Sequence, residues 1–207
     1  MSHQLKKSEG RLENIRKVKP ILAALRTISL GSWHMARSRR RNLEPYTQRL
    51  RDLLPILLPH VTAPGAALRH RAASAKEPVA EALENAVVLV IGSERGLCGR
   101  YNKELLAWLR AYVEAAPLGV TLTYAALGSR MIRELTTADY PLGLSRPLSI
   151  TSLPSYQLAH DLTIGWLQQY EAGEIDSVDV IYNADQGAGT YRPATARLLP
   201  PEPPQGA

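Results

Sequence analysis

The 207-residue sequence has a single cysteine and no apolar run long enough to cross a bilayer. One cysteine, Cys98, excludes an intrachain disulfide and fits a reducing, cytosolic compartment. The longest apolar stretches are interrupted by Arg, Pro or Gly before they reach the roughly 20 residues that a membrane-spanning helix needs. The first residues, Met1–Lys7, lead into no apolar segment of a signal peptide. We therefore expect a soluble or peripheral protein.

Motifs for metal binding and nucleophilic catalysis are also missing. Cys98 as a nucleophile would need a histidine within reach, and none of the five histidines stands in a recognisable motif. A small structural thiol is favoured over a reactive one. Asp176, Asp179 and Asp185 form the one dense acidic group late in the chain, but they lack the spacing of known metal sites. We expect Asp176 and Asp179 to cap a strand or face solvent, and we expect no catalytic residue, metal or cofactor.

Acidic residues are scarce in the first 60 positions. This segment holds 13 Lys/Arg and four Asp/Glu, a net charge of +9, whereas the remaining residues carry −3. A basic surface confined to one segment predicts an acidic partner, which could be nucleic acid, anionic lipid or an acidic protein surface. Candidate partner-binding residues are Arg26, Arg37, Arg39, Arg40 and Arg41.

Three interpretations of these arginines stay open: a solvated basic face, a docking surface for acidic protein loops, and a nucleic-acid or lipid site. Only Trp33 and Tyr46 lie near the cluster, which disfavours a platform for base stacking.

Residues 10–58 are predicted to be largely helical. Apolar or small residues recur at near-heptad spacing along one narrow stripe, and such a stripe needs a partner to be buried. Pro20 should kink the helix or mark its start, Pro45 should act in the same way, and Pro55 and Pro59 should close the segment. The stripe consists of Ile15, Val18, Leu22, Leu25, Ile28 or Ser29, Ser32 and Ala36.

The rest of the chain alternates strand and helix patterns. Residues 60–78 are predicted to form a linker, and 77–84 a short helical turn. Strands are predicted over 87–91, 120–127 and 178–182 with an edge strand over 190–199, helices over 102–115, 130–136 and 155–172, and a loop over 139–154. Ser155 is the expected N-cap of the last helix and Gly173 its C-terminal stop.

This order predicts an α/β fold: a long N-terminal helical segment and a small three-layer, Rossmann-like domain. The predicted boundaries are a helical segment over 1–60, a linker over 61–84, the α/β domain over 85–199 and a Pro-rich tail over 200–207.

A glycine-rich corner follows the first predicted strand. The unbroken apolar run Ala86–Ile91 ends at Gly92, and Gly96 and Gly99 follow before the next helix. This G-x-x-x-G-x-x-G spacing fits neither the dinucleotide fingerprint nor the P-loop. A structural turn is favoured, and a phosphate site remains the alternative. Glu94 and Arg95 are expected to form a local ion pair or a turn contact, with a substrate role at this sheet edge still open.

The corner carries a resemblance to a known family. Its sequence is similar to the S-[TD]-[DE]-R-G-L-C-G-G-[LF]-N signature of the gamma subunit of F-type ATP synthases, although Arg100 and Tyr101 depart from it. The matching residues are Arg95, Gly96, Leu97, Cys98, Gly99 and Asn102, so the structural turn is predicted to comprise Gly92, Arg95, Gly96, Cys98, Gly99 and Asn102.

Two further segments resemble the family. Residues 127–130 are similar to its [IV]-G-[SRK]-[KR] motif, and residues 170–183 to its Y-x-x-G-x-[FLY]-D-x-[VL]-x-[IVL]-[IVL]-Y-[NT] segment. The N-terminal helix matches more weakly, because Pro20, Leu22, Gly31 and Trp33 depart from the pattern. The chain looks like a divergent member.

The resemblance implies a non-catalytic rotor subunit that couples ion-driven rotation to ATP synthesis on its partners. These would be the alpha and beta subunits of the F1 ring, an epsilon-type subunit and the c-ring, with no nucleic acid. The protein would be peripheral, at the cytoplasmic face of the inner (plasma) membrane. Family members have a long C-terminal helix where this sequence ends in a proline run, so we expect half a shaft, with the second helix absent or supplied by another chain.

Two other functions remain open. One is a gamma-like interaction or regulatory protein with a new partner. The other is an α/β enzyme that binds a phosphate or nucleotide at the Gly92–Gly99 turn.

Overall fold

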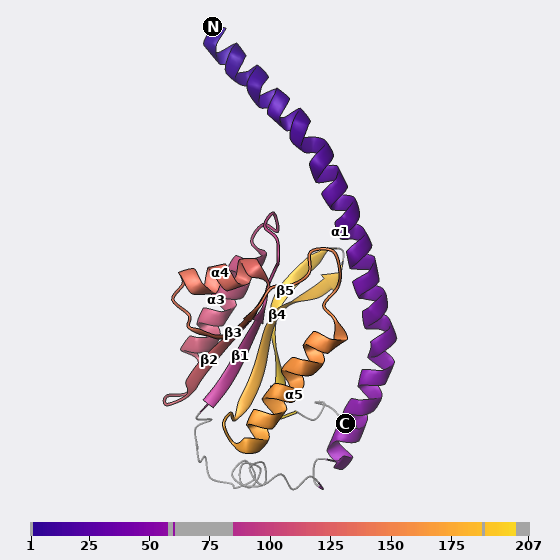
Figure 1. The fold of residues 1–207 in the computed structure, drawn as a ribbon, viewed down its shortest axis with the longest axis vertical. Coiled ribbons are helices and arrows are strands. Elements are labelled where there is room, and N and C mark those ends of the chain that lie inside the picture. Colours follow the sequence, from indigo (N-terminus) through magenta and orange to yellow (C-terminus); the bar gives the residue numbers. More distant parts are fainter. Residues whose placement is uncertain (1, 58–59, 61–84, 188, 202–207) are drawn as a thin grey trace. The chain divides into compact units, whose positions relative to one another are not determined.

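The computed structural model describes residues 2–57, 60, 85–187 and 189–201 (Figure 1). They belong to two compact units. One unit is the N-terminal helix up to Arg49 together with residues 151–153. The other contains an α/β domain.

Helix α1 (Ser2–Leu57) is continuous and curves along its length (Figure 1). It confirms the predicted helix and extends it toward the N-terminus. The helix runs through Pro20 and Pro45, so the expectation that Pro20 marks its start is wrong. Each proline removes a single backbone donor, and the surrounding Ala, Leu, Lys, Arg and Glu residues are strong helix formers. The helix ends at Leu57, two residues after Pro55.

The apolar stripe of α1 is substantially exposed. Ile15 is 64% exposed, Val18 47% and Leu22 50%. Leu25, Ser32 and Ala36, which continue the stripe, are half-buried. A helix of this length with an exposed apolar side is stabilised in proteins mainly by tertiary or quaternary packing rather than by propensity alone.

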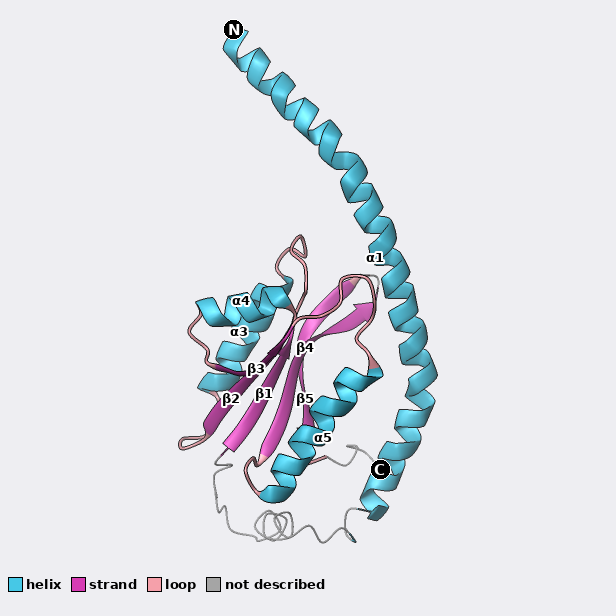
Figure 2. Cartoon of the chain, viewed as in Figure 1, coloured by secondary structure: helices cyan, strands magenta, loops and turns pink. Residues whose placement is uncertain are grey.

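The α/β domain contains a five-stranded sheet (Figure 2). Its strand order is β3-β2-β1-β4-β5, and every neighbouring pair is parallel except β4 and β5. The elements are β1 (Asn85–Ile91), α3 (Tyr101–Glu114), β2 (Thr121–Leu127), α4 (Ser129–Thr137), β3 (Leu142–Arg146), α5 (Tyr156–Ala172), β4 (Ser177–Gly187) and β5 (Thr190–Leu199).

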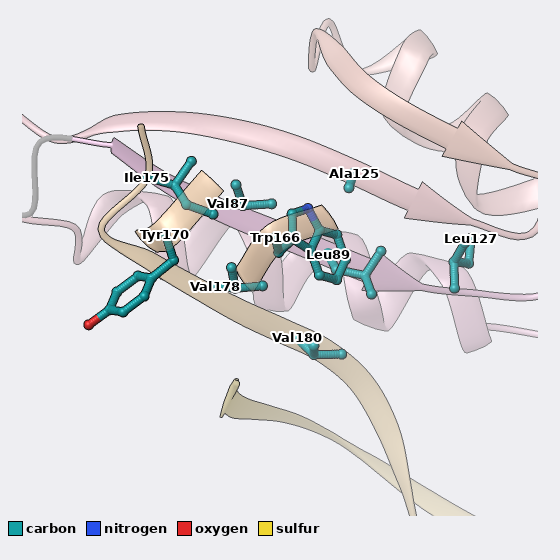
Figure 3. Close-up of a cluster of buried hydrophobic side chains, with 9 residues drawn as sticks. All are labelled: Val87, Leu89, Ala125, Leu127, Trp166, Tyr170, Ile175, Val178 and Val180. Atoms are coloured by element: carbon teal, nitrogen blue, oxygen red, sulfur yellow. The ribbon is translucent and has the colours of Figure 1, made fainter. Parts of the chain in front are cut away.

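Two apolar cores lie on opposite faces of this sheet, which gives the predicted three layers. Helices α3 and α4 cover one face and α5 covers the other (Figure 2). On the α5 face, Trp166 lies beside Leu89 of the central strand β1 (Figure 3). On the opposite face, Leu105, Leu109 and Met131 are completely buried. Strand β1 is central and buried on both faces, as its unbroken apolar run predicts.

Helix α5 has the predicted ends. The Ser155 hydroxyl accepts a hydrogen bond from the backbone N–H of Leu158 at 3.1 Å, and Gly173 adopts a left-handed φ of 75°. Strand β5 is the predicted edge strand, and it tolerates Pro193 opposite Asn183.

The loop predicted over 139–154 is partly wrong, because it contains strand β3. This strand has a glycine at its second position and only partial burial, so it shows little local periodicity. Its pairing with β2 supplies the hydrogen bonds that make it a strand. The linker predicted over 60–78, the turn over 77–84 and residues 202–207 of the predicted tail lie almost entirely outside the described residues.

Candidate functional site

The corner after β1 is built around a glycine that admits no side chain. A Cβ on Gly92 would lie 2.4 Å from the Cβ of Met131 in α4 and 2.8 Å from Oδ1 of Asn102 in α3. The Gly92 N–H still donates to the Leu127 carbonyl of β2 at 2.9 Å. The chain therefore turns out of the sheet with both helices in direct contact with its backbone.

A buried amide holds the inside of the corner. Asn102 is 5% exposed, and its Oδ1 accepts from the Ser93 N–H at 2.9 Å while its Nδ2 donates to the Ser93 hydroxyl at 2.8 Å. The Cys98 Sγ lies 3.3 Å from the same hydroxyl, and the Cys98 carbonyl accepts from the Tyr101 N–H. The thiol is thus part of a polar cluster, and no histidine is among the contacts described for it.

The outside of the corner projects an exposed leucine. Leu97 has φ 63° and is 87% exposed, and Gly99 has φ 60°. Glycine adopts this left-handed conformation without strain, whereas leucine does so at a free-energy cost. Arg95 and Gly96, which precede the leucine, are exposed as well. The tip therefore offers an apolar side chain next to a basic one.

Side chains of α3, β4 and β5 meet near the place where α/β domains usually bind ligands. Because α3 and α4 lie on one face and α5 on the other, the chain reverses its direction of winding between β1 and β4. There Asn183 Nδ2 donates to the Tyr101 carbonyl at 3.1 Å, and the Tyr101 ring packs edge-on against Tyr191 at 5.0 Å. Desolvation raises the pKa of Tyr101. This packing disfavours the phosphate interpretation of the corner.

The predicted local pair between Glu94 and Arg95 is replaced by a different contact. Glu94 Oε2 accepts from the backbone N–H of Ser129 at 2.8 Å and of Leu148 at 2.7 Å, and Oε1 accepts from the Ser129 hydroxyl at 2.6 Å. The hydrogen bond from the Ser129 hydroxyl, followed by those from the two N–H groups, lowers the pKa of Glu94. The carboxylate joins three loops at one edge of the sheet.

Four of the five candidate arginines lie on one side of α1. Taking roughly 100° per residue, Arg26, Arg37, Arg40 and Arg41 fall within an arc of about 100° along one border of the apolar stripe, while Arg39 falls within the arc of the stripe itself, next to Ser32. All five are exposed. The Arg37 guanidinium lies 4.6 Å from the centre of the Trp33 ring.

Arg40 Nε lies 3.6 Å from the Glu44 carboxylate. Both side chains are well exposed, so this pair contributes little to stability. It therefore leaves the guanidinium available to a partner at little free-energy cost.

The sequence profile of the ATP synthase family that matches this chain covers residues 4–206, almost the whole length. The chain belongs to the gamma-subunit family of ATP synthases. The match confirms the resemblance to the gamma subunit that was found in the corner after β1 and in residues 170–183, and it extends over both units.

Curated relatives bear the same family name. The gamma-family chain is 23% identical over 199 residues to the ATP synthase gamma chain of Polynucleobacter asymbioticus, covering 96% of this chain and 65% of that protein. It is 27% identical over 203 residues to that of Arthrospira platensis, covering 95% of this chain and 61% of the relative. The chain thus spans less than two thirds of the length of these relatives.

Among solved structures, the gamma-family chain is similar to a chain of the central stalk and c-ring of Tetrahymena thermophila mitochondrial ATP synthase. The TM-score is 0.47 and the identity 20%, covering 82% of this chain and 72% of the other. A chain of the Euglena gracilis mitochondrial ATP synthase gives a TM-score of 0.43 and 16% identity, with 81% and 57% coverage.

The structure brings some predicted residues together and leaves others apart. Gly92, Cys98 and Asn102 meet at Ser93, while Arg95 and Gly96 form the exposed tip. The arginines of α1 belong to the other unit. Among the described helices of this gamma-family chain, none combines the length and apolar character of a membrane span.

Sequence reasoning missed a buried charge cluster. Asp179 is 2% exposed, so the expectation that it caps a strand or faces solvent is wrong. Its carboxylate pairs with Arg197 of β5 and accepts a hydrogen bond from the Tyr112 hydroxyl of α3. Burial, followed by the hydrogen bond to Asp179, raises the pKa of Tyr112. Asp176 is a cap, because its Oδ2 accepts from the Asn85 N–H. The one available signal for Asp179 was its place inside an apolar run.

Proposed function

We propose that this chain is a non-catalytic central-stalk subunit of a rotary ATP synthase. Membership of the gamma-subunit family over residues 4–206 carries the proposal. In this function the chain couples ion-driven rotation to ATP synthesis at nucleotide sites on its partners, and it binds no nucleotide itself. The contacts of Tyr101 with Asn183 and Tyr191 at the ligand-binding edge of the sheet support that division of roles.

Helix α1 is the part that enters the ring of alpha and beta subunits. Its exposed apolar stripe needs a covering partner, and the arginines beside the stripe add charge along one border. A partner that covers the stripe and carries acidic groups next to it would satisfy both features. Arg26, Arg37, Arg40 and Arg41 are the residues of this border that we assign to the contact, and Arg39 lies on the stripe itself.

The α/β domain is the part that meets the epsilon-type subunit and the c-ring. Through this assembly the chain is peripheral to the cytoplasmic face of the inner membrane. The exposed tip of the corner, Arg95–Leu97, suits such a contact because an exposed apolar residue on a rigid turn is a typical interface anchor. The coupling ion, proton or sodium, is set by the partners.

The test is co-assembly of the full chain with alpha and beta subunits of the same organism. The wild-type chain should co-purify with them and support ATP hydrolysis by the complex. A variant with Arg26, Arg37, Arg40 and Arg41 changed to Gln should assemble more weakly, most clearly at high salt. The matched control replaces Lys103, Arg110, Arg133 and Arg192 of the α/β domain by Gln, which removes the same charge. Equal loss in both variants would count against docking through α1.

A second candidate is a gamma-like interaction or regulatory protein with a different partner. The prolines of α1 favour it, because each one interrupts the hydrogen-bond ladder of a helix that a shaft needs to be stiff. Recovery of the chain from cells without alpha and beta subunits would favour this function over the rotor.

A further inference from the structure

Strand β5 forms the antiparallel edge of the sheet, and none of its residues is buried. Its neighbour β4 begins with five consecutive buried residues, and the central strand β1 also contains five. The ladder between β4 and β5 has register irregularities at both of its ends, and Pro193 supplies no N–H to it. A segment with so few buried contacts opens locally at a lower free-energy cost than the core does.

Helix α3 holds β5 through polar and aromatic side chains. The Trp108 Nε1–H donates to the Thr195 hydroxyl at 2.9 Å, and the Tyr101 ring packs edge-on against Tyr191 at 5.0 Å. Thr195 itself is exposed. The contacts between α3 and β5 therefore depend on a few specific groups rather than on an extended apolar interface.

The strongest of these ties runs through a buried carboxylate. The Asp179 side chain of β4 is 3% exposed and pairs with Arg197 of β5, whose side chain is 25% exposed. Arg197 can therefore reach water while it stays in place, whereas Asp179 becomes hydrated only when β5 moves away. Removal of the guanidinium would leave a buried carboxylate without its counter-charge, and opening of β5 would relieve that penalty.

The turn that leads into β5 contains two glycines with left-handed backbones. Gly187 has φ 85° and Gly189 has φ 77°, and a Cβ at either position would meet nothing within 4 Å. Glycine changes its backbone conformation with little steric resistance, so these two positions provide a hinge at the start of the strand.

We propose that β5 is a latched edge strand: it opens as a unit about Gly187 and Gly189 while the rest of the sheet stays closed, and the contacts of Arg197 with Asp179 and of Thr195 with Trp108 control how often it opens. The open state presents the Asp179 carboxylate and the unpaired backbone groups of β4 to water. This conformational device is separate from the rotor function, since it concerns the isolated chain.

The first experiment is native-state hydrogen exchange of the full-length chain, followed by mass spectrometry. In the wild type, the hydrogen-bonded amides of β5 should exchange at least about tenfold faster than those of β1. Arg197→Gln should speed exchange in β5 by at least about tenfold more, because it breaks the buried pair. The matched control Arg192→Gln removes the same charge from an exposed position of the same strand and should change exchange less than about twofold.

Two outcomes of that experiment would overturn the proposal. Equal exchange rates in β5 and β1 of the wild type would mean that β5 opens only when the whole domain unfolds. Unchanged exchange of β5 in Arg197→Gln would mean that the ion pair does not control the opening.

A core variant separates opening of β5 from unfolding of the domain. Leu135 is completely buried in α4, so Leu135→Val should speed the exchange of β1 several-fold. It should leave β5 unchanged, because the contacts of Leu135 stay intact when β5 alone opens. Equal acceleration of β1 and β5 would refute a separate opening.

Thr195→Val provides a milder test of the latch if Arg197→Gln does not fold. The variant keeps the β-branched shape but removes the acceptor of the Trp108 Nε1–H, so exchange in β5 should rise by about threefold. Unchanged exchange of β5 in this variant would contradict the latch. None of these measurements involves a partner subunit, so failure here is distinguishable from failure of the rotor proposal.

Discussion

The Tyr112 hydroxyl and the Asp179 carboxylate form a hydrogen bond that connects helix α3 to strand β4 of the sheet. Asp179 lies on β4, and its other partner, Arg197, lies on the edge strand β5. One buried carboxylate therefore connects a helix and two strands. The arrangement couples the edge strand to the rest of the domain through charge as well as through its backbone ladder.

Asp179→Asn should lower the free energy of unfolding of the α/β domain by about 2–3 kcal/mol, because it leaves the Arg197 guanidinium without its counter-charge. Tyr112→Phe should lower it by about 1–2 kcal/mol, since one hydrogen bond to a charged acceptor is lost. Chemical denaturation followed by the fluorescence of buried Trp166 measures both. Asp161→Asn, an exposed site on α5, serves as the control and should stay within about 0.5 kcal/mol of the wild type. A similar effect at Asp161 would contradict the buried pair.

Gly92→Ala should be strongly destabilising, by about 3 kcal/mol or more, because the new methyl group would overlap the Met131 Cβ and the Asn102 amide. Gly165→Ala, in helix α5, is the matched change at a half-buried position. A Cβ there meets nothing within 4 Å, so the variant should gain about 0.5–1 kcal/mol from helix propensity. Thermal melts of the two variants give the comparison. Equal changes in the melting temperature of the two variants would contradict the close contact of the Gly92 backbone with Met131 and Asn102.

Leu97→Gly should raise the free energy of unfolding by about 0.5 kcal/mol, since glycine relieves the left-handed backbone but also adds entropy to the unfolded chain. Leu97→Ala keeps the backbone strain and should bring no gain. If Leu97 anchors a partner, both variants should assemble more weakly with the other ATP synthase subunits. Pull-down of the complex, set beside denaturation of the isolated chain, separates strain from recognition. A stabilised Leu97→Ala would argue against a strained leucine.

Glu94 should contribute to the acid sensitivity of the domain. Its folded pKa is lowered from 4.5, so the stabilisation is fully present above the unfolded value and is lost as the pH falls through the folded value. Unfolding measured between neutral pH and about pH 3 should show a steeper decline for the wild type than for Glu94→Gln. Ser129→Ala should lie between them, because it removes the largest cause of the lowered pKa. Superimposable profiles would contradict the contact.

Much of the fold was predictable because its signals are local. The apolar run of β1, the Ser155 and Gly173 caps of α5 and the long helical pattern of residues 10–58 all appear in short windows of sequence. Strand β3 was missed because its five residues show no periodicity of their own, and only the register with β2 makes them a strand. The expectation that Pro20 marks a helix start was wrong for the opposite reason. The local rule that proline breaks a helix was outweighed by the strong helix formers on both sides of it.

The candidate site also has features that the local sequence predicts and contacts that depend on the fold. The glycines of the corner and the arginine-rich helix can be read directly from the sequence, and the signature around Cys98 and Asn102 identified the family. The contacts of Glu94 with Ser129 and Leu148, separated by 35 and 54 positions, could not be read, because nothing local distinguishes a side chain that bridges three loops from one that pairs with its neighbour. The same holds for Asp179, whose partners lie 67 and 18 residues away.

The amino-acid order by itself determined the α/β class, the charge asymmetry, the turn after β1 and the family, because each depends on residues that are neighbours along the chain. Only the tertiary structure decided which charges are buried, which side chains contact Tyr101, and which donors hold Glu94. Those features depend on groups brought together by sheet pairing, and hydrogen bonding and desolvation act on distances in space rather than in sequence.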